Sequence, residues 1–211
     1  MESWTAGGLP DSPRRATILH AIAAHDDGWL ELDAAPIVGE SGAIDDFMTL
    51  PAALRQAVWP RGVLRLAGDP WAAALVAQHA VWIFSRFRDD PDWASFFDQM
   101  TRLRDTFVAR SGLSLAELEH DYDFVRLGDL VSLTFCNAWT DQQDHAGCVV
   151  TCDGSTVVVR PDPFGARAIP IEIRGVRMPN RRYRDAADAA EAWRAGPPVS
   201  IAGRVVGDSA A

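Results

Sequence analysis

Through residues 1–145, apolar side chains recur three and four positions apart, the spacing of helices that bury one face. Ile18, Leu19 and Ile22 form the first stripe. It follows Ser12-Pro13, a capping serine with proline at the first helical position, and we expect Gly28 to end the helix in the left-handed conformation. Four further helices are predicted, over residues 51–58, 70–86, 92–109 and 114–137. We expect Asp69 to cap the second, the third to end near Gly112, and a capping box, Ser114 to Glu117, to begin the fourth.

After Gly147 the spacing changes to the alternation that is typical of strands. Residues 148–152 and 155–160 flank Asp153-Gly154 and predict a β-hairpin with a tight turn. A strand, a short helix and a last strand are expected over residues 169–176, 186–195 and 199–206. The predicted fold is mainly α: an HD-like helical body at residues 1–145 and a small β-rich part at 146–211, α+β overall, packed as one unit.

Composition limits the classes of function. The hydrophobic content of 48% is enough for a core, and the net charge of -9 argues against nucleic-acid binding, which needs a basic face. No apolar run is long enough to span a membrane, and residues 1–10 lack the pattern of a secretory signal. With only three cysteines, the sequence predicts a cytoplasmic protein with reduced thiols.

The string His25-Asp26-Asp27-Gly28-Trp29 places an imidazole and two carboxylates at a helix end. His25 and Asp26 continue the apolar stripe, so we expect both to face the interior, where a carboxylate needs a partner. His79 lies on the apolar face of its helix, and Asp129 interrupts an apolar stretch of another. Since His and Asp are ligands for divalent metals, three helices are expected to direct metal-binding groups inward.

His25-Asp26 at a helix end, with Asp129 in a later long helix, resembles the HD superfamily of metal-dependent phosphohydrolases. A closer similarity is to an uncharacterised bacterial family of unknown function. Its hallmarks in this chain are His25-Asp26-Asp27-Gly28-Trp29, Asp33, Pro36, Asp69-Pro70-Trp71, His79, the Asp129 segment and Arg160-Pro161-Asp162-Pro163-Phe164.

The resemblance implies a helical core and one divalent ion, Mg, Mn, Fe or Zn, held by His25, Asp26 and Asp129. It places His79 beside the ion, as an additional ligand or a phosphate-facing group, and it makes Asp27 a candidate base. Trp29 and Asp33 are candidates for lining the ligand pocket. The HD pattern also includes a histidine on a preceding helix. His20 is a poor substitute, because it lies about 140° around the helix from His25 at about 100° per residue.

Structural interpretations remain open for each candidate. His25-Asp26 can close its helix with a hydrogen bond, His79 can be a core histidine, and Asp129 can pair with Arg126 or Arg65. Asp27 can be a solvated charge, and Trp29 and Asp33 can anchor the following loop.

The sequence therefore predicts a metal-dependent phosphohydrolase acting on a small phosphoester or nucleotide. The alternative is a catalytically degenerate HD-like protein that binds a small ligand or a partner protein. The sequence leaves a homodimer open.

Overall fold

The computed structural model describes residues 12–208, so the predicted absence of a signal at residues 1–10 and the final residues 209–211 lie outside it. The helices are α1 (Arg15–Ala24), α2 (Ala52–Arg65), α3 (Pro70–Ile83), α4 (Ala94–Ser111), α5 (Leu115–Cys136) and α6 (Ala186–Ala195). The strands are β1 (Gln143–His145), β2 (Cys148–Asp153), β3 (Thr156–Arg160), β4 (Ile169–Val176) and β5 (Pro198–Gly207). The fold is α+β, as the sequence predicts at this coarse level.

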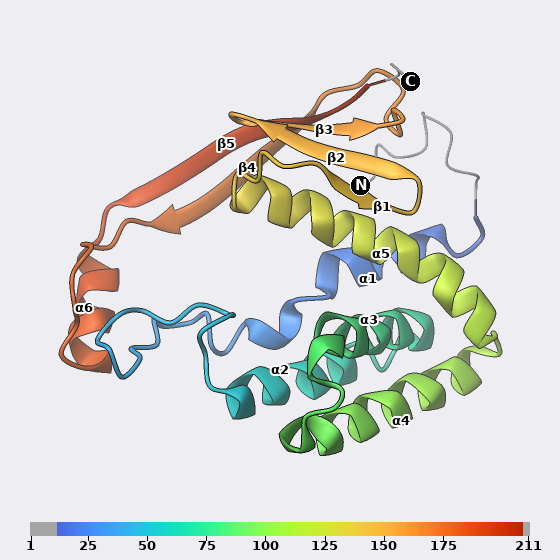
Figure 1. Ribbon diagram of the computed structural model, residues 1–211, viewed down its shortest axis with the longest axis horizontal. Helices are drawn as coiled ribbons and strands as arrows, with labels where there is room; N and C mark the ends of the chain where they lie inside the picture. The colour runs from blue at the N-terminus through green and yellow to red at the C-terminus, as the bar shows by residue number, and fades with distance from the viewer. Residues whose placement is uncertain (1–11, 209–211) are drawn as a thin grey trace.

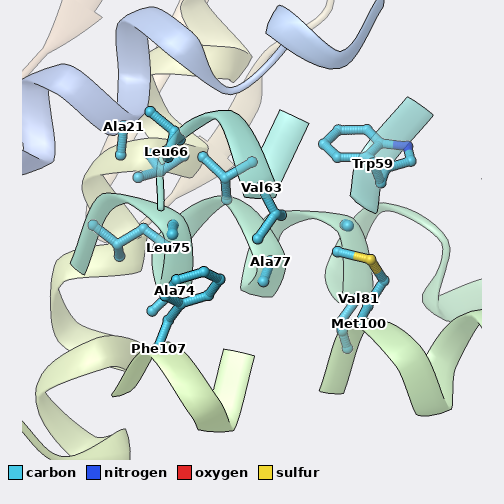
Figure 2. Packing of buried hydrophobic residues seen from close by; sticks show 14 of the residues in the cluster. Ala21, Trp59, Val63, Leu66, Ala74, Leu75, Ala77, Val81, Met100 and Phe107 are labelled. Carbon is cyan, nitrogen blue, oxygen red and sulfur yellow. The ribbon is translucent and has the colours of Figure 1, made fainter. Parts of the chain in front are cut away.

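Helix α3 is the centre of the helical body (Figure 1). Its alanines (Ala72, Ala73, Ala74, Ala77, Ala80) are fully buried, and such small side chains let neighbouring helices approach closely. Figure 2 shows Trp59, Val63 and Leu66 of α2 against one side of α3, with Met100 and Phe107 of α4 against another. The α3 residues therefore have fixed positions relative to α1, α2, α4 and α5.

The five strands form one sheet in the order β1-β2-β3-β5-β4, antiparallel except for the β3–β5 pair. Helix α5 lies along this sheet (Figure 1) and packs Leu127 and Phe135 against sheet residues such as Val157. Phe124 of α5 contacts both this cluster and the core of the helical body. Helix α5 is thus shared between the two layers.

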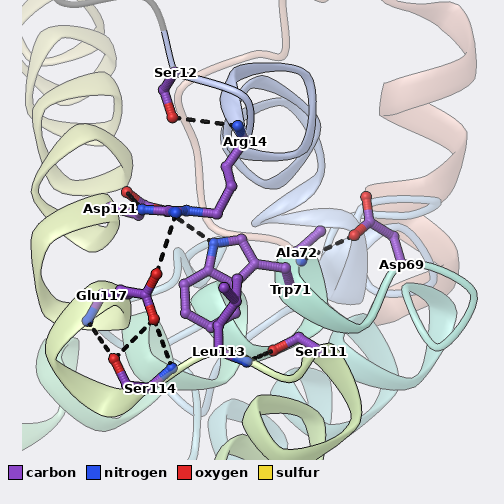
Figure 3. A network of polar contacts seen from close by, with 10 residues as sticks. All are labelled: Ser12, Arg14, Asp69, Trp71, Ala72, Ser111, Leu113, Ser114, Glu117 and Asp121. Carbon is purple, nitrogen blue, oxygen red and sulfur yellow. Dashed lines mark hydrogen bonds and ion pairs between the residues drawn. The ribbon is translucent and has the colours of Figure 1, made fainter.

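A buried polar network fixes α1, α3 and α5 at one end (Figure 3). The Asp121 carboxylate accepts hydrogen bonds from the Arg14 guanidinium and from Trp71 Nε1. The predicted capping box of α5 is present, because Ser114 Oγ accepts from Glu117 N while the Glu117 carboxylate accepts from Ser114 N. These contacts set the relative positions of the three helices that carry the candidate site.

The first helix differs from its prediction at both ends. Ser12 does not cap it: its hydroxyl accepts from Arg14 N, and α1 begins only at Arg15. The helix ends at Ala24, and Gly28 lies in a 3₁₀ turn, Asp27–Trp29, without a positive φ. A Cβ on Gly28 would lie 2.2 Å from the Val58 carbonyl oxygen, so glycine is required for the close approach to α2.

Other boundaries also differ from the sequence pattern. Helix α2 continues to Arg65 through Pro60, because its buried face beyond that point, including Gly62 and Val63, packs onto the core. Strand β1 was not predicted and pairs antiparallel with β2. Gly112 ends α4 with a φ of 73°, and Asp69 caps α3, both as expected. No helix described in residues 12–208 combines the length and apolar character that crossing a membrane requires.

Candidate metal centre

Three predicted residues from three helices meet in the helical body. His25 follows α1, His79 lies in α3 and Asp129 lies in α5. The Nε2 atoms of His25 and His79 lie 3.6 Å and 3.8 Å from the two carboxylate oxygens of Asp129. One ligand atom from each residue lies within 4.8 Å of those of the other two. As the helix patterns predict, these three side chains point into the helical body.

The two imidazoles are oriented by contacts at their other nitrogen. His25 Nδ1 lies 2.8 Å from the Ile22 carbonyl oxygen, which only accepts hydrogen bonds, so Nδ1 carries the proton and Nε2 of the neutral ring has a free lone pair. His79 Nδ1 lies 3.1 Å from the Tyr122 hydroxyl. Both rings therefore direct Nε2 to Asp129. Metal binding by His79 requires the tautomer in which its Nδ1–H donates to the Tyr122 oxygen.

The facing nitrogens lack hydrogen-bond partners. His25 Nε2 and His79 Nε2 are both buried without a partner of suitable geometry, and His79 has no exposed surface. Buried polar atoms are nearly always satisfied. His25 Nε2 has ion-pair contacts with Asp26 and Asp129, whereas the fully buried His79 Nε2 has only Asp129 Oδ2, 3.8 Å away, and needs an explanation. A cation between the three groups would provide it.

The electrostatics of the two histidines differ. Burial opposes a charge on His25, but the carboxylates of Asp129 and Asp26 outweigh it and raise the pKa of His25 to about 10. Complete burial lowers the pKa of His79 to about 4, despite the charge of Asp129. One imidazole is thus held as a cation and the other as a neutral ring. A bound metal ion would take the place of the proton on His25, because ligands must be deprotonated.

Asp26 is placed differently from its prediction. It does not face the interior: its side chain is 63% exposed, with Oδ2 3.2 Å from His25 Nε2. The reason is that α1 ends at Ala24, so Asp26 no longer follows the buried helical stripe. Desolvation favours the neutral acid, but the contact with His25 prevails and the pKa of Asp26 lies below its ordinary value. Asp26 lies outside the set of three converging groups.

The remaining predicted residues lie around this centre. Asp27 is half-buried in the 3₁₀ turn after His25. Trp29 packs on the core, with its ring 6.5 Å from that of Trp59, whose ring in turn lies 5.6 Å from that of His79. Asp33 is exposed, and desolvation together with the charge of Asp26 raises the pKa of its carboxyl. Trp29 therefore packs against Trp59, which in turn packs against His79, while Asp33 lies near Asp26.

The structural alternatives for Asp129 are not found. Arg65 pairs with Glu31, and Arg126 forms no ion pair among residues 12–208. Outside the cluster, His20 lies 3.0 Å from Asp69, so it does not replace the missing upstream histidine of the HD pattern. His79, from a later helix, supplies the second imidazole instead.

The sequence does not identify Tyr122 as a neighbour of the centre, and it offers Arg126 only as an ion-pair partner of Asp129. Tyr122, which contacts His79 Nδ1, lies two helical turns before Asp129 on α5. Arg126 lies over the ring of Trp82, 3.8 Å from its centroid, and Trp82 stacks against His79. Helical spacing could have identified both residues. Residues 122, 126 and 129 share one helical face, so the neighbours of Asp129 on that face are candidates for the site.

The three groups would hold one small divalent ion if they drew closer together, because their ligand atoms lie within 4.8 Å of one another. Ligand atoms around such an ion lie about 3–3.5 Å apart when each bond is about 2.0–2.2 Å. The separations of 3.6 Å and 3.8 Å are only slightly longer. Two neutral imidazoles and one carboxylate suit Zn or Fe, and they leave coordination positions open for water or substrate.

Comparisons with known proteins agree with a family of unknown function. Neither the curated proteins nor the solved structures contain a match to this chain. One family model, described as Protein of unknown function (DUF3891), matches residues 1–180, which include His25, His79 and Asp129 and all of α1 to α5. Because the match covers well over half of its length, the chain belongs to this family.

Proposed function

We propose that this protein is a divalent-metal-dependent phosphohydrolase that acts on a small phosphoester, with an HD-like arrangement of its helices. The observation that supports this most strongly is the convergence of His25 Nε2 and His79 Nε2 on the two carboxylate oxygens of Asp129. The ligands in this proposal are His25, His79 and Asp129. His79 takes a ligand position that the resemblance assigns to Asp26, because Asp26 faces solvent.

The likeness to HD phosphohydrolases supports the choice of reaction. As in that pattern, a His-Asp pair at a helix end approaches an aspartate of a later long helix. Here the second histidine comes from α3, after the His-Asp pair rather than before it. The order along the chain differs, but a metal ion responds only to the positions of its ligand atoms.

The protein groups have separable roles in this proposal. A bound divalent ion would polarise a phosphoryl oxygen and lower the pKa of its water ligand. The Ile22 carbonyl and the Tyr122 hydroxyl hold the two imidazoles in place. Asp26 lies at the border between the centre and solvent, so its carboxylate is positioned to accept a proton from water. Asp27, the base predicted from sequence, is a second candidate for this role.

The test is hydrolysis of a panel of small phosphoesters, including p-nitrophenyl phosphate and nucleoside monophosphates. Protein stripped with a chelator is reloaded with Mg, Mn, Fe or Zn. We expect metal-dependent turnover that Asp129→Asn abolishes and that His20→Ala, a substitution outside the cluster, leaves unchanged.

Two outcomes would contradict the proposal in different ways. Stoichiometric metal binding without turnover of any substrate would favour the catalytically degenerate alternative, a protein that binds a ligand or partner. Turnover that is unaffected by Asp129→Asn would place the reaction elsewhere in the chain.

A further inference from the structure

Next to the candidate metal centre lies an arginine without an anionic partner. Among residues 12–208, Arg126 has no ion pair and no hydrogen bond, and its Nε is buried without a partner. The contact described for its side chain is a cation–π contact with Trp82, over whose ring the guanidinium lies. An arginine in this state has its N–H donors available for an anion.

The helices place this guanidinium beside the ligands. On α5, Arg126 lies one turn after Tyr122 and one turn before Asp129, while on α3, Trp82 lies one turn after His79. His79 contacts Tyr122, and Trp82 contacts Arg126, so the two helices form adjacent layers of contacts. Asp129 faces the imidazoles and not Arg126, although both project from the same helix.

Several carboxylates surround the centre, so an anionic ligand would need a positively charged group besides the metal ion. Asp26, Asp33 and Asp129 lie at or near the three-residue cluster, and Asp123 contacts His145 close by. These carboxylates would repel a phosphate group that approached the metal ion. Arg126 lies over the ring of Trp82, which stacks against His79, and this places its positive charge where it can offset that repulsion.

The contact with Trp82 selects the kind of ligand. A guanidinium over an aromatic ring is held by attraction to the π-face, while its N–H groups project from its edge. Such a fixed fork matches two oxygens of one phosphate better than a flexible ammonium does. Trp82 is 39% exposed, so the layer that holds Arg126 reaches the surface.

We propose that Arg126, positioned by Trp82, binds the non-bridging oxygens of a phosphate group beside the metal centre. The inference rests on the proposed function, since it assigns the residue that recognises the anionic part of its substrate. Arg126 would contact the substrate directly, and Trp82 is a positioning residue that acts through Arg126.

The experiment is calorimetric titration of the full chain with inorganic phosphate, in metal-free and metal-loaded forms. We expect Arg126→Gln to weaken phosphate binding about tenfold or more, the effect of removing a charged hydrogen-bond donor. Arg126→Lys should recover only part of the affinity, because it restores the charge without the fork. Trp82→Leu should weaken binding less than Arg126→Gln does.

The control is Arg88→Gln, which removes an arginine over another aromatic ring, that of Phe97, 4.9 Å from its centroid. It should leave phosphate affinity unchanged. Metal content is measured for every variant and should equal that of the wild type in Arg126→Gln. Phosphate affinity that is equal in Arg126→Gln and wild type, or the absence of phosphate binding to both forms of the wild type, would overturn this inference. A wild-type chain that binds phosphate through Arg126 but binds no metal would overturn the proposed function alone.

Discussion

His79 Nε2 lies 3.8 Å from Asp129 Oδ2, and the two atoms come from helices that do not follow one another in the chain. The separation is too long for a hydrogen bond but suits two ligands of one cation. The same carboxylate faces His25 through its other oxygen. Asp129 therefore faces both imidazoles, and its place between them depends on how α5 packs against α1 and α3.

Tyr122 should tune metal affinity without being a ligand. We expect Tyr122→Phe to weaken metal binding about 10- to 100-fold, because His79 Nδ1 loses the hydroxyl that orients its ring. The matched control is Tyr183→Phe, which removes a hydroxyl that donates to the Pro179 carbonyl, outside the cluster. Metal titration with a competing chelator measures both. Equal affinity in Tyr122→Phe and wild type would show that this contact does not orient a ligand.

Gly28 should be intolerant of any side chain. Gly28→Ala places a Cβ 2.2 Å from the Val58 carbonyl oxygen, so α2 or the turn after His25 must shift. We expect a loss of about 1–3 kcal/mol in the free energy of unfolding, the usual cost of overpacking. Gly68→Ala is the control, since nothing lies within 4 Å of its Cβ, and it should gain about 0.4–1 kcal/mol or be neutral. Urea unfolding measures both, and a fully stable Gly28→Ala would refute the close approach.

Asp188 should make stability depend on pH in acid. Hydrogen bonds from Arg181, together with the Arg184 backbone amide, hold the pKa of its carboxyl well below its ordinary value. Because the folded pKa is the lower one, this contribution is complete above the unfolded pKa, about 3.9. It is lost as the pH falls from there through the folded pKa.

The variant Asp188→Asn tests this pH dependence. Its melting temperature should lie below that of the wild type at neutral pH, and the difference should shrink as the pH falls below about 4. Thermal melts between neutral pH and pH 2.5 follow this difference. A constant difference across the whole range would contradict the assignment.

Local signals in the sequence predict much of the fold. The cap at Asp69, the capping box at Ser114 and the left-handed Gly112 each act within a few residues, and all three are present. The hairpin around Gly154 forms for the same reason. The predicted boundaries are wrong where packing against segments distant in sequence determines the structure. Pro60 would end an isolated helix, but α2 continues because its far end is buried.

The same distinction between local signals and packing of distant segments applies to the candidate site. His79 and Asp129 could be identified because a polar residue on an apolar helical face must have a partner. The partner itself could not be predicted, since it depends on the crossing of α1, α3 and α5. Asp26 was placed inside on the assumption that α1 continues, and the early end of that helix turns it outward. The sequence indicates Arg126 only as a partner for Asp129, because its contact with Trp82, on a helix distant in sequence, depends on packing.

In the proposed function, His25, His79 and Asp129 hold one divalent metal ion. The most direct test is the metal content of the purified, folded chain and of His25→Ala, His79→Ala and Asp129→Ala, measured by mass spectrometry, with His120→Ala as a control outside the cluster. We predict close to one equivalent in the wild type and in His120→Ala, and near-complete loss in each of the other three. A wild type that neither retains nor takes up a divalent metal would contradict the account, as would variants of all three residues that keep it.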